Sequence, residues 1–395
     1  MDDEPNRVRR AGLRLGRVFG VPVVISPTWL IMAVLVTLIY ADVVRAVLPQ
    51  LPDTLVYLVS FGFVVTLFGS VFLHELGHAL VSRYYRIPVR SITLEMLGGR
   101  TEMAAEAERP KAEALIALAG PAVSAVLGLI GVAAVVMIPP HTISAQFAFQ
   151  VAACNILVAV YNALPGLPLD GGQALRALVW AVKGDKHLAS RVAGRVGRGV
   201  AVATGAAGAV LYYTDLVGLL AILFGFMVAA MLWVGATRAI QLGTIGARFH
   251  LLEVTRLLRR AVEVVPGTPL AEVLRRVADQ DAAGALVVDS GGHAQALMTS
   301  ASVEAVPRER RPWVRVDDVS RSLDPDTVWN PRWRGEEVIR AMRRHPANEY
   351  AVVEDGLPLG IVRSADIVAM LDPRGGNGPT DSASSTVHHQ EDHQT

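Results

Sequence analysis

The chain has 395 residues, of which 52% are hydrophobic, and its formal net charge at pH 7 is +1. This composition is too apolar for an ordinary soluble protein of that length, and it favours several membrane spans joined to a soluble part. The single cysteine, Cys154, excludes an intrachain disulfide and a cysteine-based zinc site. No basic cluster lies beside aromatic residues, so no nucleic-acid partner is expected.

Six apolar stretches are predicted to cross a bilayer, and they lie at about residues 27–44, 55–82, 114–138, 143–164, 196–214 and 216–237. Basic residues are concentrated before the first span, between the second and third, between the fourth and fifth, and after the sixth. The positive-inside rule therefore predicts that both termini lie in the cytoplasm. A retained first span is preferred to a cleaved signal peptide, because the apolar stretch is too long.

The second span ends in the pentapeptide His74-Glu75-Leu76-Gly77-His78. The pattern H-E-x-x-H puts two histidines one helical turn apart, where both can bind one zinc ion, and the glutamate can take a proton from a zinc-bound water. Ionisable groups in a membrane segment are costly and usually mark a functional site. The competing interpretation is a structural pair of histidines inside a helix bundle.

The fourth span leads to a candidate third ligand, Asp170, in the segment Asn-Ala-Leu-Pro-Gly-Leu-Pro-Leu-Asp-Gly-Gly at residues 162–172. A catalytic zinc usually has three protein ligands and one water. The predicted orientation brings Asp170 to the same membrane face as the two histidines, and the prolines break the helix so that its backbone can line a polar cavity. Alternatively, Asp170 is only the N-cap of the next helix.

The two motifs, in this order and about ninety residues apart, resemble the site-2 protease family of intramembrane zinc metalloproteases. The resemblance covers roughly residues 10–240 and includes Ala119-Gly120-Pro121, although Ser124 stands where many members have asparagine. It implies one Zn²⁺ per chain and assigns each motif residue a role. The implied ligands are His74, His78 and Asp170, the implied catalytic base is Glu75, and the implied substrate-binding residue is Asn162.

The segment 89–99, just after the zinc helix, has partial alternation of apolar and polar residues. It is predicted to form strands near the membrane face, which resemble the membrane-associated β region of the family. Its edge is predicted to pair with a locally unwound substrate, with Ile92→Pro or Leu94→Pro as the test. The alternative is a cytoplasmic loop that does not contact the substrate.

After about residue 245 the chain becomes charged, and two half-units repeat weakly. They resemble a tandem cystathionine-β-synthase (CBS) pair, a small α/β module that often binds adenine nucleotides. The resemblance implies a nucleotide-binding role for Asp366, although Arg363 stands where that family favours threonine or serine. The alternative is a structural or dimerising domain without a ligand.

The expected fold class is mainly α: a polytopic membrane bundle of about six transmembrane helices, with a C-terminal cytoplasmic α/β CBS-pair domain. The predicted organisation is a cytoplasmic N-terminal segment (1–20), a transmembrane metalloprotease domain (21–244), a CBS-pair regulatory domain (245–372) and a disordered tail (373–395). The expected location is a bacterial cell membrane.

The resemblance implies a zinc-dependent endopeptidase that cuts membrane proteins in or near their transmembrane segments, as in regulated intramembrane proteolysis. The expected partners are such a substrate and the lipid bilayer; an adenine nucleotide at the CBS pair and a homodimer are further hypotheses. Two alternative functions are a proteolytically inactive relative that binds membrane proteins and a CBS-regulated transporter. The presence of Glu75 and all three candidate ligands favours the protease.

Overall fold

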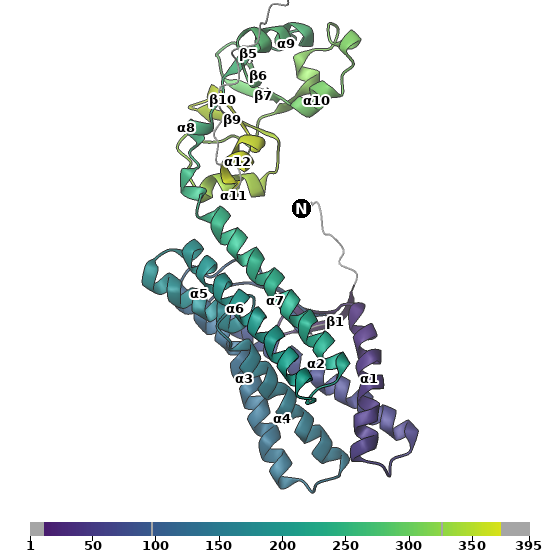
Figure 1. The fold of residues 1–395 in the computed structure, drawn as a ribbon. Helices are drawn as coiled ribbons and strands as arrows, with labels where there is room; N and C mark the ends of the chain where they lie inside the picture. Colours follow the sequence, from purple (N-terminus) through teal and green to yellow (C-terminus); the bar gives the residue numbers. More distant parts are fainter. Residues whose placement is uncertain (1–11, 96–97, 325–326, 373–395) are drawn as a thin grey trace, which may run out of the picture. The chain divides into compact units, whose positions relative to one another are not determined.

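The structure is a computed structural model that describes residues 12–95, 98–324 and 327–372. The chain divides into two compact units, Met1–Gly243 and Thr244–Thr395, and Figure 1 follows their elements in chain order. Most of the predicted N-terminal segment and the predicted tail lie outside the described residues.

Five helices of the first unit are long and apolar enough to cross a membrane, and they coincide with five of the six predicted spans. The remaining predicted span, 196–214, lies within α6 (Lys186–Tyr213), which begins with Lys186 and carries Arg191, Arg195 and Arg198. These charges keep α6 less apolar than the other helices, and its crossing of the membrane stays a prediction. The five helices are α1 (Thr28–Val47), α2 (Asp53–Tyr84), α3 (Pro110–Met137), α4 (Ile143–Asn162) and α7 (Leu219–Gly246).

Small residues allow α3 and α4 to pack closely against each other (Figure 1). A Cβ at Gly131 would lie 2.5 Å from the backbone nitrogen of Ala152, and one at Gly128 would lie 2.7 Å from Ile156 Cγ1. Large apolar side chains such as Leu129 and Leu157 are instead exposed on the outside of these helices. This pattern suits a membrane bundle, in which small residues line the helix contacts and lipid covers the apolar exterior.

A four-stranded sheet lies beside α2, in the order β1-β2-β3-β4. Its strands are β1 (Leu13–Val18), β2 (Val21–Ile25), β3 (Val89–Glu95) and β4 (Gly98–Met103). The predicted strands after the zinc helix are confirmed, whereas the hairpin of β1 and β2 was not expected from the sequence. The predicted edge is wrong for residues 89–95, because β3 pairs with β2 on one side and β4 on the other, so the edge strand is β4.

The second unit contains two half-units with the same order of elements, helix-strand-strand-helix, as the sequence repeat predicts. The first has α9 (Leu270–Asp279), β6 (Gly284–Val288), β7 (Ala294–Met298) and α10 (Ser300–Glu304). The second has α11 (Glu336–Arg344), β9 (Glu349–Glu354), β10 (Leu357–Arg363) and α12 (Ser364–Leu371). The short elements α8 (Val254–Leu257), β5 (Ala261–Val264) and β8 (Ser320–Ser322) accompany them.

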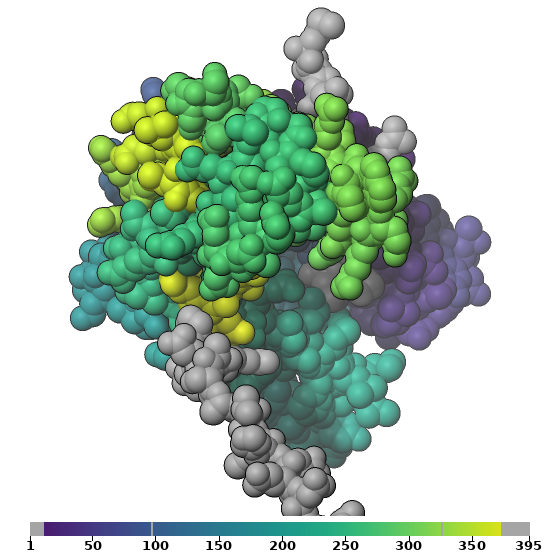
Figure 2. All heavy atoms as spheres, turned by 90° about the horizontal axis from the view of Figure 1, so that it is seen from above, coloured from purple at the N-terminus to yellow at the C-terminus, as the bar shows by residue number. Residues whose placement is uncertain are grey.

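The two half-units form one body because they share an apolar core. Leu286 and Leu297 of the first half pack with Ala351 and Ile361 of the second, and all four are buried. Figure 2 shows atoms of the first half, in green, packed against those of the second, in yellow. This α/β body has the two paired half-units that the sequence repeat predicts.

Candidate metal centre

The site is built from the last third of α2 and the first residue of α5 (Asp170–Lys183). His74 and His78 are one turn apart in α2, and their side chains face the same point from the interior of the bundle, with 5% and 7% exposure. The irregular segment 163–169 ends α4 and turns the chain so that Asp170 starts a new helix beside α2 and α3. The structure therefore brings the three predicted ligands together.

The three ligand atoms are spaced as the corners of a metal site. Asp170 Oδ2 lies 3.1 Å from His74 Nε2 and 3.3 Å from His78 Nε2, and the two Nε2 atoms are 3.2 Å apart. Tetrahedral zinc with bonds of about 2.0–2.1 Å separates its ligands by about 3.3 Å, so the donor set fits zinc. Among the described residues, these three side chains form the group of His, Cys, Asp and Glu that can hold a metal ion.

Hydrogen bonds at the far side of each imidazole fix its orientation. His78 Nδ1 lies 2.7 Å from the carbonyl oxygen of Ile116, which can only accept, so Nδ1 carries the proton and Nε2 is free to bind a metal. His74 Nδ1 lies 2.9 Å from Ser124 Oγ. Partners of this kind select the metal-binding tautomer. The Ile116 contact leaves the lone pair of His78 Nε2 facing His74 Nε2 and Asp170 Oδ2, where it can bind a metal ion.

Gly120 lets α3 approach the ligand atoms closely. A Cβ built at Gly120 would lie 2.3 Å from His78 Nε2 and 2.6 Å from His74 Nε2, which is closer than real Cβ contacts. Any side chain here would therefore enter the volume that the metal needs. This close approach explains why a glycine stands at the centre of the sequence motif Ala119-Gly120-Pro121.

Glu75 is buried beside the ligands but does not belong to the metal-binding group. The hydroxyl of Thr101 on β4 lies 2.7 Å from Glu75 Oε2 and 3.1 Å from the carbonyl oxygen of Glu75, and it donates to the nearer Oε2. Within the described residues, Oε1 accepts no hydrogen bond, so it is the oxygen that is available to a water molecule. This arrangement suits a general base.

Asn162 is the last residue of α4 and is half-buried. Within the described part of the chain, its side-chain amide makes no hydrogen bond. It therefore has free donors at the start of the segment that leads to Asp170, but its role stays a prediction.

Sequence reasoning missed the ion pair that secures α5. Arg176 Nε lies 2.5 Å from Glu113 Oε1 on α3, and the Glu113 side chain is 6% exposed. Because α5 starts at Asp170, this pair anchors the helix that carries the third ligand. An acidic residue at the start of an otherwise apolar span was the available signal, but its partner is 63 residues away in the sequence.

Asp366, the predicted nucleotide-binding residue, lies in the first turn of α12 and already has a partner. Arg259 donates to both of its carboxylate oxygens, at 2.7 and 2.8 Å. The hydrogen bond that Arg259 donates to Asp366 raises the pKa of the Arg259 guanidinium. A ribose would have to displace this arginine to reach Asp366.

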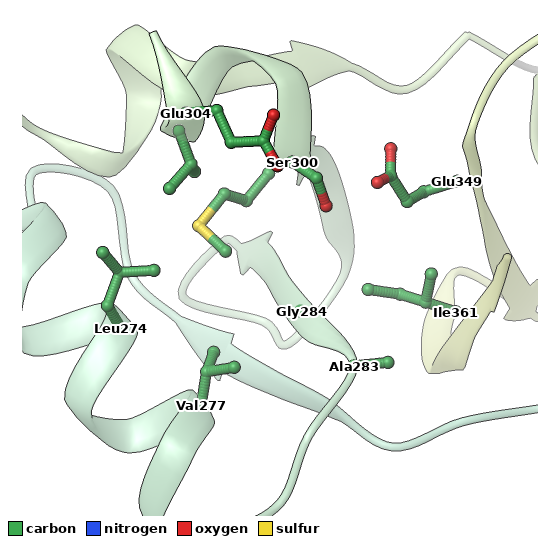
Figure 3. A pocket seen from close by; sticks show the side chains of 10 residues that line it. Leu274, Val277, Ala283, Gly284, Ser300, Glu304, Glu349 and Ile361 are labelled. Atoms are coloured by element: carbon green, nitrogen blue, oxygen red, sulfur yellow. The ribbon is translucent and has the colours of Figure 1, made fainter. Parts of the chain in front are cut away.

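The second unit has a cavity of about 230 Å³ between its half-units. Its floor is apolar and includes Leu274, Val277 and Ile361, while Glu304 and Glu349 line its polar side (Figure 3). Two carboxylates disfavour the negative charge of a phosphate by like-charge repulsion. The cavity therefore has room for a small ligand, but its charge does not suit a polyphosphate.

Known proteins resemble the chain over both units. Residues 62–152 and 139–204 match the model of Peptidase family M50. Rip3 of Mycobacterium tuberculosis, described by its name as a zinc metalloprotease, is 30% identical over 375 residues, which cover 92% of this chain and 93% of Rip3. A Synechocystis protein named in the same way, sll0528, is 28% identical over 91% of this chain and 95% of its own length. The solved site-2 protease from Methanocaldococcus jannaschii is 23% identical, with a TM-score of 0.41, over 58% of this chain and 95% of that chain.

Proposed function

The chain belongs to peptidase family M50, the site-2 protease family of zinc metalloproteases, and we propose that it cuts membrane proteins in or near their transmembrane segments. The observation that carries this proposal is the convergence of His74, His78 and Asp170 at zinc spacing inside a helix bundle. Residues 21–244 then form the protease domain and residues 245–372 the regulatory domain.

The proposed reaction assigns a task to each side chain. His74, His78 and Asp170 would hold the zinc, which would supply a Lewis acid for the scissile carbonyl and lower the pKa of a water. Glu75 Oε1 accepts the proton of the attacking water and later delivers it to the nitrogen of the leaving amine. The Asn162 amide donates a hydrogen bond to the substrate backbone or the developing oxyanion.

A peptide bond in a helix is shielded, so the substrate must unwind before it is cut. Within the described residues the outer side of β4 pairs with no other strand, and β4 lies against α2 next to Glu75. We place the proposed substrate pairing on this edge rather than on β3. Disulfide trapping tests it: in a Cys154→Ala background, Arg100→Cys should cross-link to alternate cysteines along a substrate, and equal trapping at every position would contradict strand pairing.

The proposed location is a cell membrane with both termini in the cytoplasm. This topology requires α6 to cross in addition to the five apolar helices, because five crossings would leave the termini on opposite sides. Reporter fusions after residues 183 and 215 test it directly. Opposite locations for the two reporters are expected, and the same location would contradict the crossing of α6.

The decisive experiment compares the membrane proteomes of cells that carry the native protein or Glu75→Gln. The substitution keeps a side chain of the same shape and removes the general base. Uncut substrates should therefore accumulate, and the proteins enriched in the Glu75→Gln membranes are the candidate substrates. Unchanged membrane proteins under growth and stress conditions would favour an inactive, membrane-protein-binding relative. A solute flux that depends on the protein and survives Glu75→Gln would favour the transporter.

A second proposed function is ligand regulation through the CBS pair, for which the 230 Å³ cavity is the favouring observation. Titration calorimetry of the full-length protein with AMP and ATP tests the adenine-nucleotide hypothesis. Heat that disappears in Glu349→Trp, which fills the cavity, would support it. No heat would favour the alternative of a structural or dimerising domain, and the sedimentation of the same sample reports whether the chain is a homodimer.

A further inference from the structure

One face of β4 packs against α2 in the region of Glu75. A Cβ at Gly99 would lie 2.4 Å from Glu75 Cγ, the hydroxyl of Thr101 donates to Glu75 Oε2, and Met103 Sδ accepts from Ser82 Oγ at 3.6 Å. Alternate residues of a strand share one face. The α2-facing side of β4 therefore consists of Gly99, Thr101 and Met103, and two of these three positions meet Glu75.

The strand register supports this orientation. Thr101 is paired with Ile92 and Gly99 with Leu94, and Ile92 and Leu94 are both buried. Directly opposite residues of an antiparallel pair lie on the same face of the sheet. The buried face of β3 and the Thr101 face of β4 are therefore one continuous surface, which packs on α2.

We propose that Thr101 is a positioning residue that holds the Glu75 carboxylate in its proton-accepting orientation. This inference rests on the proposed role of Glu75 as general base. The last torsion of a glutamate side chain is broad, so the carboxylate of Glu75 needs an external contact to fix its plane. A hydroxyl that donates to a carboxylate makes a charge-assisted hydrogen bond, which is stronger than a neutral one.

The hydrogen bond from Thr101 gives the two carboxylate oxygens of Glu75 different roles. Oε2 is occupied by the Thr101 hydroxyl, and Oε1 is left to accept the proton from water. Gly99 contributes by the absence of a side chain, because any Cβ there would displace Glu75. The base is therefore oriented by a strand that is distant from it in the sequence, and its orientation depends on the exact placement of β4.

The kinetic test uses zinc-loaded full-length protein in detergent, with β-casein as an unfolded probe whose peptide bonds need no unwinding. Thr101→Val removes the hydroxyl and keeps the shape, and it should lower kcat about tenfold with KM nearly unchanged. Thr101→Ser should restore most of kcat. Thr93→Val is the matched control: Thr93 alternates with Ile92 and Leu94 and therefore lies on the opposite face of the same sheet. A native kcat in Thr101→Val, or an equal loss in Thr101→Ser, would overturn the proposal.

A second readout does not depend on proteolysis. The visible spectrum of the cobalt-substituted protein reports the environment of the metal-bound water, with which Glu75 interacts. Thr101→Val and Glu75→Gln should both change this spectrum, whereas Thr101→Ser and Thr93→Val should leave it native. An unchanged spectrum in Thr101→Val would overturn the positioning role. If casein remains uncut by native protein while the spectra behave as expected, the proposed protease function fails and the Thr101 contact stands.

Discussion

The candidate ligand-binding residues of the two units differ in the partners that they have in the structure. In the membrane unit, one atom each of His74, His78 and Asp170 lies within 3.3 Å of the other two, and together they can bind one metal ion. In the CBS pair, the predicted ligand-binding residue Asp366 has both carboxylate oxygens occupied by Arg259. Three ligand atoms that converge on one point can hold a metal ion, whereas the carboxylate of Asp366 already has a bidentate partner.

The structure also supports the zinc-site prediction more strongly than the prediction of a ligand site in the CBS pair. The metal centre is supported by a partner behind each histidine, Ser124 and the Ile116 carbonyl, and by a glycine that leaves room for the ion. The cavity of the CBS pair has apolar walls and two carboxylates but no basic side chain in its lining. The chemistry of the membrane unit is therefore specific, while that of the CBS pair only restricts the charge of its ligand.

The largest expected effect comes from filling the metal volume. Gly120→Ala would place a Cβ 2.3 Å from His78 Nε2, so the variant should lose zinc and all proteolytic activity. Metal analysis of the purified protein measures the zinc directly. Gly225→Ala is the matched control, since nothing lies within 4 Å of a Cβ at that position of α7. Full zinc occupancy in Gly120→Ala would show that the metal does not lie between the two imidazoles.

The next largest effect concerns the ion pair that anchors α5. Arg176→Met would leave the buried Glu113 carboxylate without its partner, which should cost about 3–5 kcal/mol of stability. Thermal unfolding in detergent should show a lower Tm, and zinc content should fall because Asp170 belongs to the same helix. Arg45→Met removes two exposed ion pairs, with Asp42 and Asp53, and serves as the control. Equal Tm values for the two variants would contradict an anchoring role for Arg176.

Motif spacing and helix geometry were enough to predict that His74, His78 and Asp170 come together, while their role as zinc ligands and the role of Glu75 as base stay predictions. H-E-x-x-H fixes two ligands through the pitch of one helix, and the break after α4 indicated Asp170. The supporting contacts could not be predicted from the sequence because they join distant segments. Thr101 and Glu75 are 26 residues apart in the sequence, and Arg176 and Glu113 are 63 residues apart. The hairpin of β1 and β2 was missed because its apolar residues merge with those of the first span.

A smaller effect is expected at the hydrogen bond behind His74. Ser124→Ala removes the partner of Nδ1, and losing such a contact lowers metal affinity about 10–100-fold. Competition with a zinc chelator measures the change. Ser60→Ala is the matched control, because Ser60 is equally buried but bonds only to the backbone of its own helix. Identical chelator curves for the two variants would show that Ser124 does not support the metal.

The smallest effect is expected at Asp366. Asp366→Asn removes the ion pair with Arg259, but the Arg259 side chain is 50% exposed, so solvent screening limits the loss of stability to about 1 kcal/mol or less. Zinc content and proteolysis in the full-length protein should stay native, because the pair lies outside the metal centre. Thermal unfolding and metal analysis of the same sample check both expectations. A loss of zinc or of kcat in Asp366→Asn would mean that the ion pair at α12 is energetically coupled to the metal centre. The Arg259–Asp366 pair could then no longer be treated as independent of the site formed by His74, His78 and Asp170.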